Sequence, residues 1–153
     1  VSTERMVRLV DDLLNVSRID TGRKFDIILK QIDIIQILQS VIQEQMPGAA
    51  IKKLKLTLAA NVPKSMVLSI DELKMRQVFQ NLVNNAIKYS KEKTAIEVGC
   101  DKSKKDEVVF YVRDHGVGIP KKQQVQVFNK FFNQTAFFNA QRHGFIVFFI
   151  FFA

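Results

Sequence analysis

The run EVVFYVRD at residues 107–114 limits the possible folds of this 153-residue chain more than any other stretch. Residues 108–112 are all apolar, so a strand formed here would bury both of its faces and would need a neighbour on each edge. The polar segment DKSKKD separates it from a second strand pattern, TAIEVGC at 94–100. We therefore expect an antiparallel hairpin whose second strand is central in its sheet.

Helical spacing alternates with strand spacing along the rest of the chain. We expect a helix over 4–20 that ends at Thr21-Gly22, and a second helix that begins after Asp33 and ends at Pro47-Gly48. A third helix is expected at about 71–89, capped by Ser69 and Glu72. A last helix should follow VGIP and end at VFNKFF.

Three further strands are expected, two of them from alternating apolar residues. They lie in KFDIILKQIDI (24–34), around Leu54 to Leu58, and in SMVLSI (65–70). Helices and strands thus mix without strict alternation, which favours an α+β layered fold over a doubly wound sheet.

Composition restricts the environment and the partners. Twenty-three Lys and Arg against 15 Asp and Glu give a net charge of +8, which favours anionic partners. The lysines gather where turns are expected, as at 52–55, 91–93 and 102–105, so we interpret them as solvated edges and expect no nucleic acid. With Cys100 as its one cysteine the chain has no intrachain disulfide, which indicates a reducing compartment. No secretory leader is visible, and the apolar run 145–153 is shorter than a membrane span, so we expect a soluble, cytoplasmic domain.

The third expected helix carries an unusual polar stripe. At 100° per residue, Asn81, Asn85 and Lys88 lie within about 60° of each other. Met75, Val78, Phe79, Leu82 and Ala86 mark the opposite side as the packed one. Amide oxygens suit Mg²⁺, and a lysine nearby is a point charge for phosphate. A solvated polar face would give the same stripe, so the stripe alone does not decide between the two.

The phrase DHGVGIP (114–120) follows the central strand directly, where loops commonly form ligand sites. Gly116 and Gly118 permit positive φ and close approach of backbone to a flat ligand. Asp114 at the strand end can accept a hydrogen bond from an exocyclic amine. The alternative is a plain turn with a solvent-facing Asp114. The phrase matches neither a P-loop nor the G-x-G-x-x-G dinucleotide pattern.

Taken together, these phrases resemble the ATP-binding domain of sensor histidine kinases. RQVFQNLVNNAIKYS (76–90) resembles the N box of that family, DHGVGIP its first glycine box and VFNKFF (127–132) its phenylalanine box. ERMVRLVDDLLNVSRIDTG (4–22) is similar to the end of the dimerisation hairpin that precedes the domain. The resemblance implies the Bergerat-type two-layer α/β sandwich, a mixed sheet covered by helices on one face.

The resemblance also implies roles for particular residues. Asn81 and Asn85 would serve Mg²⁺ and the phosphates of ATP, with Asn85 as the metal ligand. Lys88 would contact phosphate, and Tyr89 would flank the nucleotide. No catalytic side chain is assigned.

The glycine box would form the part of the site that binds the adenine base. Asp114 would bind the adenine amino group, while Gly116 and Gly118 would shape the pocket around it. Phe128, Phe131 and Phe132 would pack at the root of a lid.

The chain departs from the family at both ends. Its two histidines, His115 and His143, lack the helical, acid-flanked context of a phospho-acceptor, so the chain is expected to begin after the acceptor. A second glycine box should follow the phenylalanine box and bind phosphates with its amides, yet residues 133–153 offer only Gly144. Residues 128–153 instead hold 10 of the 13 phenylalanines. A shifted reading frame, a truncated gene, a poorly determined sequence end, or a genuine apolar strand or helix would each account for this tail.

We accordingly divide the chain into residues 1–22 (hairpin end), 23–132 (ATP-binding domain) and 133–153 (Phe-rich tail). The first interpretation is the ATP-binding part of a histidine kinase whose parent dimerises through the hairpin and passes phosphate to a response regulator. The family resemblance implies a parent anchored in the bacterial inner membrane. The second is a degenerate, non-catalytic nucleotide-binding or dimerisation module.

Overall fold

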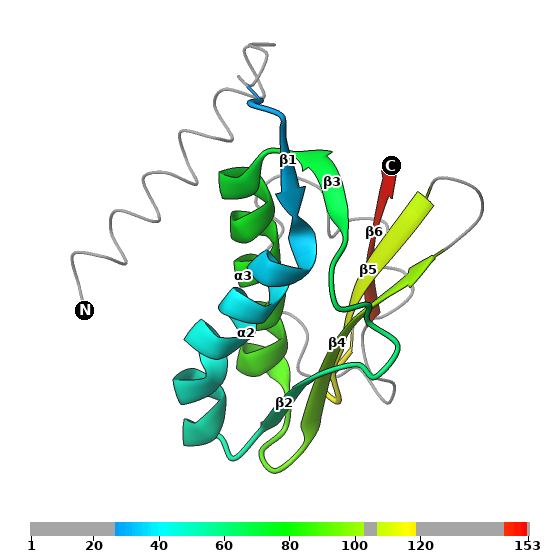
Figure 1. Ribbon diagram of the computed structural model, residues 1–153. Coiled ribbons are helices and arrows are strands. Elements are labelled where there is room, and N and C mark those ends of the chain that lie inside the picture. Colours follow the sequence, from blue (N-terminus) through cyan, green and yellow to red (C-terminus); the bar gives the residue numbers. More distant parts are fainter. Residues whose placement is uncertain (1–26, 103–106, 119–145, 153) are drawn as a thin grey trace, which may run out of the picture.

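The computed structural model describes residues 27–102, 107–118 and 146–152. The described part contains two helices and six strands (Figure 1). Their bounds in chain order are β1 Lys30–Asp33, α2 Ile34–Ile51, β2 Lys55–Leu58, β3 Val67–Ile70, α3 Glu72–Tyr89, β4 Ala95–Lys102, β5 Glu107–Arg113 and β6 Ile146–Phe152. The predicted helix at 4–20, the proposed division at residue 22 and the phenylalanine-box region lie outside the described residues.

Four of the strands form a mixed sheet in the order β2-β4-β5-β6. The β2 and β4 strands are parallel, with Leu56 opposite Ile96. The predicted hairpin is confirmed, since β4 and β5 are antiparallel with Cys100 opposite Phe110. The expectation that β5 is central is confirmed as well, because β6 pairs along its other edge. Of the origins considered for the Phe-rich tail, an apolar strand agrees with the backbone of residues 146–152.

Both helices cover one face of this sheet, which gives the predicted α+β sandwich (Figure 1). Residues from α2, α3 and the sheet share one apolar core, and its fully buried members include Ile35, Leu38, Phe79, Ile96 and Phe110. In the described residues no helix is long and apolar enough to cross a membrane.

The start and the end of α2 differ in how well the sequence predicted them. Asp33 is the N-cap as predicted, because its carboxylate accepts the N–H of Ile35 at 3.0 Å. The expected end at Pro47-Gly48 is wrong, since the helix continues to Ile51. Pro47 lies on the exposed side, where water can satisfy the carbonyl that loses its N–H partner. Ala49 is buried in the core and holds the last turn in place.

Two predictions at the small β1-β3 sheet need correction. Asp71, not Ser69, caps α3 by accepting the N–H of Lys74 at 3.1 Å, whereas Ser69 is part of β3. The first strand begins at Lys30, so Ile27 and Leu29 precede it and are exposed. Lys30 pairs with Ile70, the last residue of β3. The strand offers no further residue for pairing, because the next residue, Asp71, is already the N-cap of α3.

Candidate functional site

The helix α3 presents different residues to the core and to solvent. Asn81, Asn85 and Lys88 are all exposed on one side, as the stripe predicted. The buried residues of the helix are Met75, Phe79, Val83 and Ala86, while Val78 and Leu82, which we had placed on the packed side, are only partly buried. The helix is held to the sheet by its buried face, so its amides and its ammonium are available to a ligand.

The last turn of α3 places a cation beside an aromatic ring. The Lys88 ammonium lies 4.9 Å from the centre of the Tyr89 ring, a distance at which the two attract. Tyr89 is half-buried and Lys88 is exposed. At 1.5 Å per residue, Asn81 lies about 12 Å from Tyr89 along the helix axis. The predicted residues on α3 therefore form one elongated surface.

Asp114 comes directly after β5 and is buried, with 6% of its surface exposed. Its Oδ1 accepts the backbone N–H of Gly116 at 2.6 Å, which folds the loop back over the carboxylate. The alternative of a solvent-facing Asp114 in a plain turn is therefore wrong. A buried carboxylate is costly unless hydrogen bonds satisfy it, and because each of its oxygens can accept more than one, it is suited to a donor such as an amine.

Gly116 joins this loop to the end of α3. It forms an isolated antiparallel pair with Ser90, the residue that follows the helix. A Cβ at Gly116 would lie 2.7 Å from the Tyr89 carbonyl oxygen and 2.8 Å from Asp114 Oδ1, so no other residue fits without movement. Gly118 has φ 71°, in the left-handed region that favours glycine. Both glycines are thus required by the loop geometry.

The structure therefore brings together the two sequence elements that predict nucleotide binding. Through Ser90 and Gly116, the C-terminal end of α3 and the Asp114 loop become one surface. Asn81 and Asn85 extend this surface along the helix.

The residues present fit a nucleotide and a magnesium ion that the nucleotide helps to hold. Asp114 supplies a buried carboxylate, and the loop packs tightly against the end of α3, since the Tyr89 carbonyl and Asp114 Oδ1 fill the space beside Gly116. Within the described ranges no group of three or more His, Cys, Asp and Glu side chains could hold a metal ion. Mg²⁺ commonly takes only one or two protein ligands and completes its shell with phosphates and water, so an amide such as Asn85 suits it.

Sequence reasoning missed two residues beside this surface. Lys52 was interpreted as part of a solvated edge, yet it is half-buried and its ammonium contacts three carbonyls at the end of α3. Ser90 is also buried, and its hydroxyl has no hydrogen-bond partner in the part of the chain that the structure describes. No local pattern announces Lys52, because its partners lie 35 to 38 residues away.

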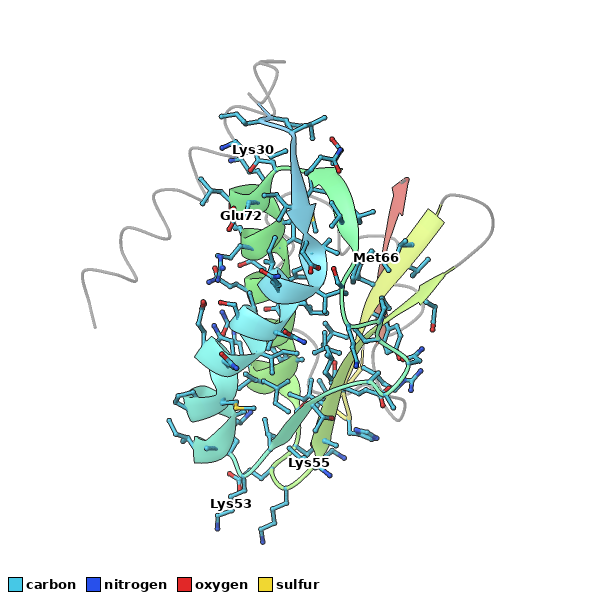
Figure 2. The ribbon with its side chains drawn as sticks, in the orientation of Figure 1. Lys30, Lys53, Lys55, Met66 and Glu72 are labelled. Atoms are coloured by element: carbon cyan, nitrogen blue, oxygen red, sulfur yellow. The ribbon has the colours of Figure 1, made fainter. Side chains whose placement is uncertain are left out.

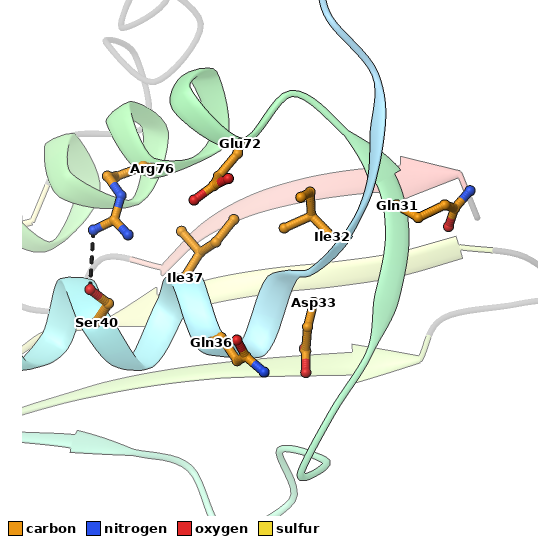
Figure 3. A pocket seen from close by; sticks show the side chains of 8 residues that line it. All are labelled: Gln31, Ile32, Asp33, Gln36, Ile37, Ser40, Glu72 and Arg76. Atoms are coloured by element: carbon orange, nitrogen blue, oxygen red, sulfur yellow. Dashed lines mark hydrogen bonds between the residues drawn. The ribbon is translucent and has the colours of Figure 1, made fainter.

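A separate hollow of about 370 Å³ lies at the other end of the helix pair (Figure 3). It is lined by Gln31, Ile32, Asp33, Gln36, Ile37, Ser40, Glu72 and Arg76. Its charged groups are largely engaged: Arg76 pairs with Glu44 at 2.7 Å, and Asp33 accepts the N–H of Met66 at 3.0 Å. That N–H is the main cause that lowers the pKa of Asp33. The hollow contains none of the predicted site residues.

Comparison with known proteins identifies the family of the chain. Residues 70–149 match the family described as "Histidine kinase-, DNA gyrase B-, and HSP90-like ATPase". The sensor histidine kinase WalK of Bacillus subtilis is 33% identical over 132 residues, which is 85% of this chain. The alginate biosynthesis sensor protein KinB of Pseudomonas aeruginosa is 33% identical over 83% of this chain. In both cases the chain spans 21% of the relative's length.

Solved structures share the fold. Full-length ShkA in complex with AMPPNP superposes with a TM-score of 0.73 at 26% identity, covering 83% of this chain and 27% of ShkA. The Acinetobacter baumannii histidine kinase AdeS gives a TM-score of 0.67 at 21% identity, covering 78% of this chain and 58% of AdeS. The histidine kinase ThkA in complex with the response regulator TrrA gives 0.68 at 20%, covering 86% of this chain and 38% of ThkA.

Proposed function

Because the chain belongs to the family of histidine kinase-, DNA gyrase B- and HSP90-like ATPases, we propose that it binds Mg-ATP as part of a two-component sensor histidine kinase. The observation that carries the proposal is the pairing of Ser90 with Gly116. This pairing joins the end of α3, which carries Asn81, Asn85 and Lys88, to the loop that begins at Asp114. Two phrases that are 23 residues apart in the sequence thereby line one surface. The AMPPNP complex of ShkA supports a nucleotide as the ligand class.

The adenine base would bind at the Asp114 loop. Asp114 is buried and its carboxylate is held by the Gly116 N–H, and an ionised carboxylate only accepts hydrogen bonds, so it would take the exocyclic amine of adenine as a donor. Gly116 and Gly118 would allow the base to lie against backbone, and the Tyr89 ring would flank it. An amine can donate a hydrogen bond to the buried carboxylate, whereas a carbonyl oxygen cannot. The site would therefore favour adenine over bases that present a carbonyl at this position.

The phosphates would extend along α3 toward Asn85 and Asn81. Lys88 would neutralise part of their charge, and Asn85 would contribute an amide oxygen to Mg²⁺. The ion would supply charge neutralisation at the transferring phosphoryl group. The chain's own part would be to hold and orient the nucleotide.

In the parent protein, the γ-phosphoryl group would pass to a histidine on a dimerisation hairpin and then to an aspartate of a response regulator. The complex of ThkA with TrrA supports a receiver domain as partner. We propose a homodimeric parent held together by the hairpin, and no role for nucleic acid. Residues 1–26 lie outside the described part.

Calorimetric titration with Mg-ATP and Mg-ADP tests the proposal. The unaltered chain should bind both, whereas Asn85→Ala and Asp114→Asn should each weaken binding at least about tenfold, since each removes a charge-assisted or metal contact. Asp114→Asn keeps an acceptor for the Gly116 N–H while it presents an NH₂ to the amine. Gln43→Ala, at an exposed position on α2, is the matched control and should bind normally.

A folded chain that binds neither nucleotide would overturn the proposal. Binding that survives both substitutions would place the nucleotide elsewhere.

A non-catalytic nucleotide-binding or dimerisation module is the second candidate function. The glycine content after the first glycine box favours it, because residues 133–153 offer only Gly144 where a second glycine box is expected. His115 is exposed, and its Nδ1 lies 2.9 Å from the Ala95 carbonyl oxygen in a loop.

Phosphotransfer separates the two functions. The chain is incubated with radiolabelled Mg-ATP and a separate hairpin domain that carries an acceptor histidine. Label on the hairpin supports the kinase function, while nucleotide binding without label supports the non-catalytic module.

A further inference from the structure

Lys52 reaches from the end of one helix to the end of the other. It follows Ile51, the last residue of α2, and its ammonium donates to the carbonyl oxygens of Ile87 at 2.9 Å, Lys88 at 2.8 Å and Ser90 at 3.1 Å. Its three hydrogen-bond donors match these three acceptors, so the ammonium is fully used within the protein.

These contacts satisfy groups that the helix leaves unpaired. The last carbonyls of an α-helix have no intrahelical partner, and their dipoles favour a positive charge nearby. Here the cation that bonds the carbonyls is Lys52, the residue that follows α2, while Lys88 in the last turn of α3 lies over the Tyr89 ring. Lys52 therefore ties the end of α3 to the end of α2.

Lys52 is itself fixed at its backbone. Its N–H donates to the Ala49 carbonyl at 3.2 Å, and its carbonyl accepts the N–H of Lys93, in the turn that follows α3, at 3.2 Å. The turns at both helix ends are thus joined, and the Lys52 side chain spans the gap between them. Figure 2 labels the nearby Lys53 and Lys55 at this end of the molecule, where both are exposed.

The three carbonyls belong to the segment that leads into the candidate site. Lys88 and Tyr89 carry the proposed phosphate and base contacts, and Ser90 pairs with Gly116. A shift of this segment would move the Tyr89 carbonyl, which lies 2.7 Å from the position of a Cβ at Gly116. The shape of the part of the candidate site that would bind adenine therefore depends on where Lys52 holds the end of α3.

We propose that Lys52 is a positioning residue for the nucleotide site: it does not touch the nucleotide but holds Lys88, Tyr89 and the Ser90–Gly116 pair in the binding arrangement. This role rests on the proposed nucleotide function. Sequence neighbours such as Lys53 and Lys55 are exposed and supply only charge.

The test compares the full chain with Lys52→Met, Lys52→Arg and Lys91→Met. Methionine keeps the apolar stem and removes the ammonium, arginine keeps the charge, and Lys91→Met removes an equal charge from an exposed residue next to Ser90. Mg-ADP affinity is measured by calorimetry at a temperature where circular dichroism shows every variant folded. Amide hydrogen exchange is followed at Ser90 and Gly116.

Lys52→Met should weaken Mg-ADP binding about tenfold and speed exchange at both amides, since charge-assisted bonds are lost. Lys52→Arg should restore part of the affinity, and Lys91→Met should stay within about twofold of the unaltered chain. Unaltered binding by Lys52→Met, or an equal loss in Lys91→Met, overturns the positioning role while the nucleotide function stands. Absence of binding by the unaltered chain overturns the nucleotide function, and with it the role of Lys52.

Discussion

The two faces of α3 are built for different purposes, although they share one backbone. The inner face packs Phe79 against Phe110 in an edge-to-face contact, with ring centres 5.4 Å apart and planes at 61°. The outer face exposes Asn81, Asn85 and Lys88, which make no contribution to the core.

This separation means that stability and ligand binding should respond to different substitutions. Apolar burial supplies most of the folding free energy, and it depends on area removed from water. Exposed amides lose little when they are truncated, because water already satisfies them. The different roles of the two faces can be tested by substitutions along α3 and at its two ends.

Phe79→Ala should give the largest effect. Phe79 is 1% exposed, and its removal leaves a cavity between α3 and β5, so the free energy of unfolding should fall by about 3–5 kcal/mol. Urea unfolding followed by circular dichroism measures the change. Leu73→Ala is the control on the same helix, because Leu73 is 77% exposed and should cost less than about 0.5 kcal/mol. Similar losses in both variants would remove the distinction between the faces.

Acid should weaken the N-terminal ends of both helices. Hydrogen bonds lower the pKa of both caps from 3.8, with the N–H of Met66 as the main cause for Asp33 and the N–H of Ile28 for Asp71. A lowered pKa in the folded state stabilises the protein above pH 3.8, and this contribution disappears as the pH falls through the lower, folded-state values.

Thermal midpoints at pH 7, 5, 4 and 3 measure this effect. The contribution of these two caps to the thermal midpoint should change little from pH 7 to 5. Below pH 4 this contribution should be lost, and the midpoint should fall. The double variant Asp33→Asn, Asp71→Asn keeps capping side chains that do not ionise, so its fall should be shallower. An equally steep fall would assign the acid sensitivity to other groups.

Lys93→Gly should raise stability by a smaller amount. Lys93 has φ 62°, and Lys53 in the neighbouring turn has φ 56°, both in a region that glycine adopts without steric cost. The substitution should add about 0.5–1 kcal/mol to the free energy of unfolding, since relief of strain exceeds the extra freedom of the unfolded chain. Lys91→Gly, where φ is not positive, should instead be neutral or destabilising. Urea unfolding of the two variants gives the comparison directly.

Asn85→Ala should have the smallest effect on stability. Alanine is the better helix former and Asn85 is exposed, so the free energy of unfolding should change by less than about 0.5 kcal/mol, with a gain favoured. The same variant should lose nucleotide affinity in the titration described above. A large loss of stability would show that the polar stripe of Asn81, Asn85 and Lys88 has a structural role.

The sequence predicted the elements whose signal is local. The two-sided apolar run of β5 gave both the hairpin with β4 and its central place in the sheet, and the 3.6-residue spacing of α3 separated its two faces. Asp33 was identified as a cap because capping depends on the next few residues.

The sequence was less informative where distant residues decide. Pro47 does not end α2, because burial of Ala49 outweighs a local breaker on an exposed side. Lys52 resembles its solvated neighbours in sequence, and only the packing of α2 beside α3 brings three carbonyls within its reach. The pairing of Ser90 with Gly116 also depends on tertiary structure, although both phrases were recognised separately.

The parallel pairing of β2 with β4 has a consequence for the order of folding. Residues 55–58 pair with residues 95–98, and α3 lies in the intervening chain. The β4–β5 hairpin closes a short loop, whereas β2 can join only after a loop of some 40 residues has closed, which costs more chain entropy. Packing of the inner face of α3 onto the hairpin would shorten that loop before β2 arrives. The outer face takes no part in these steps, so its residues are free to vary with the ligand without slowing the assembly of the sheet.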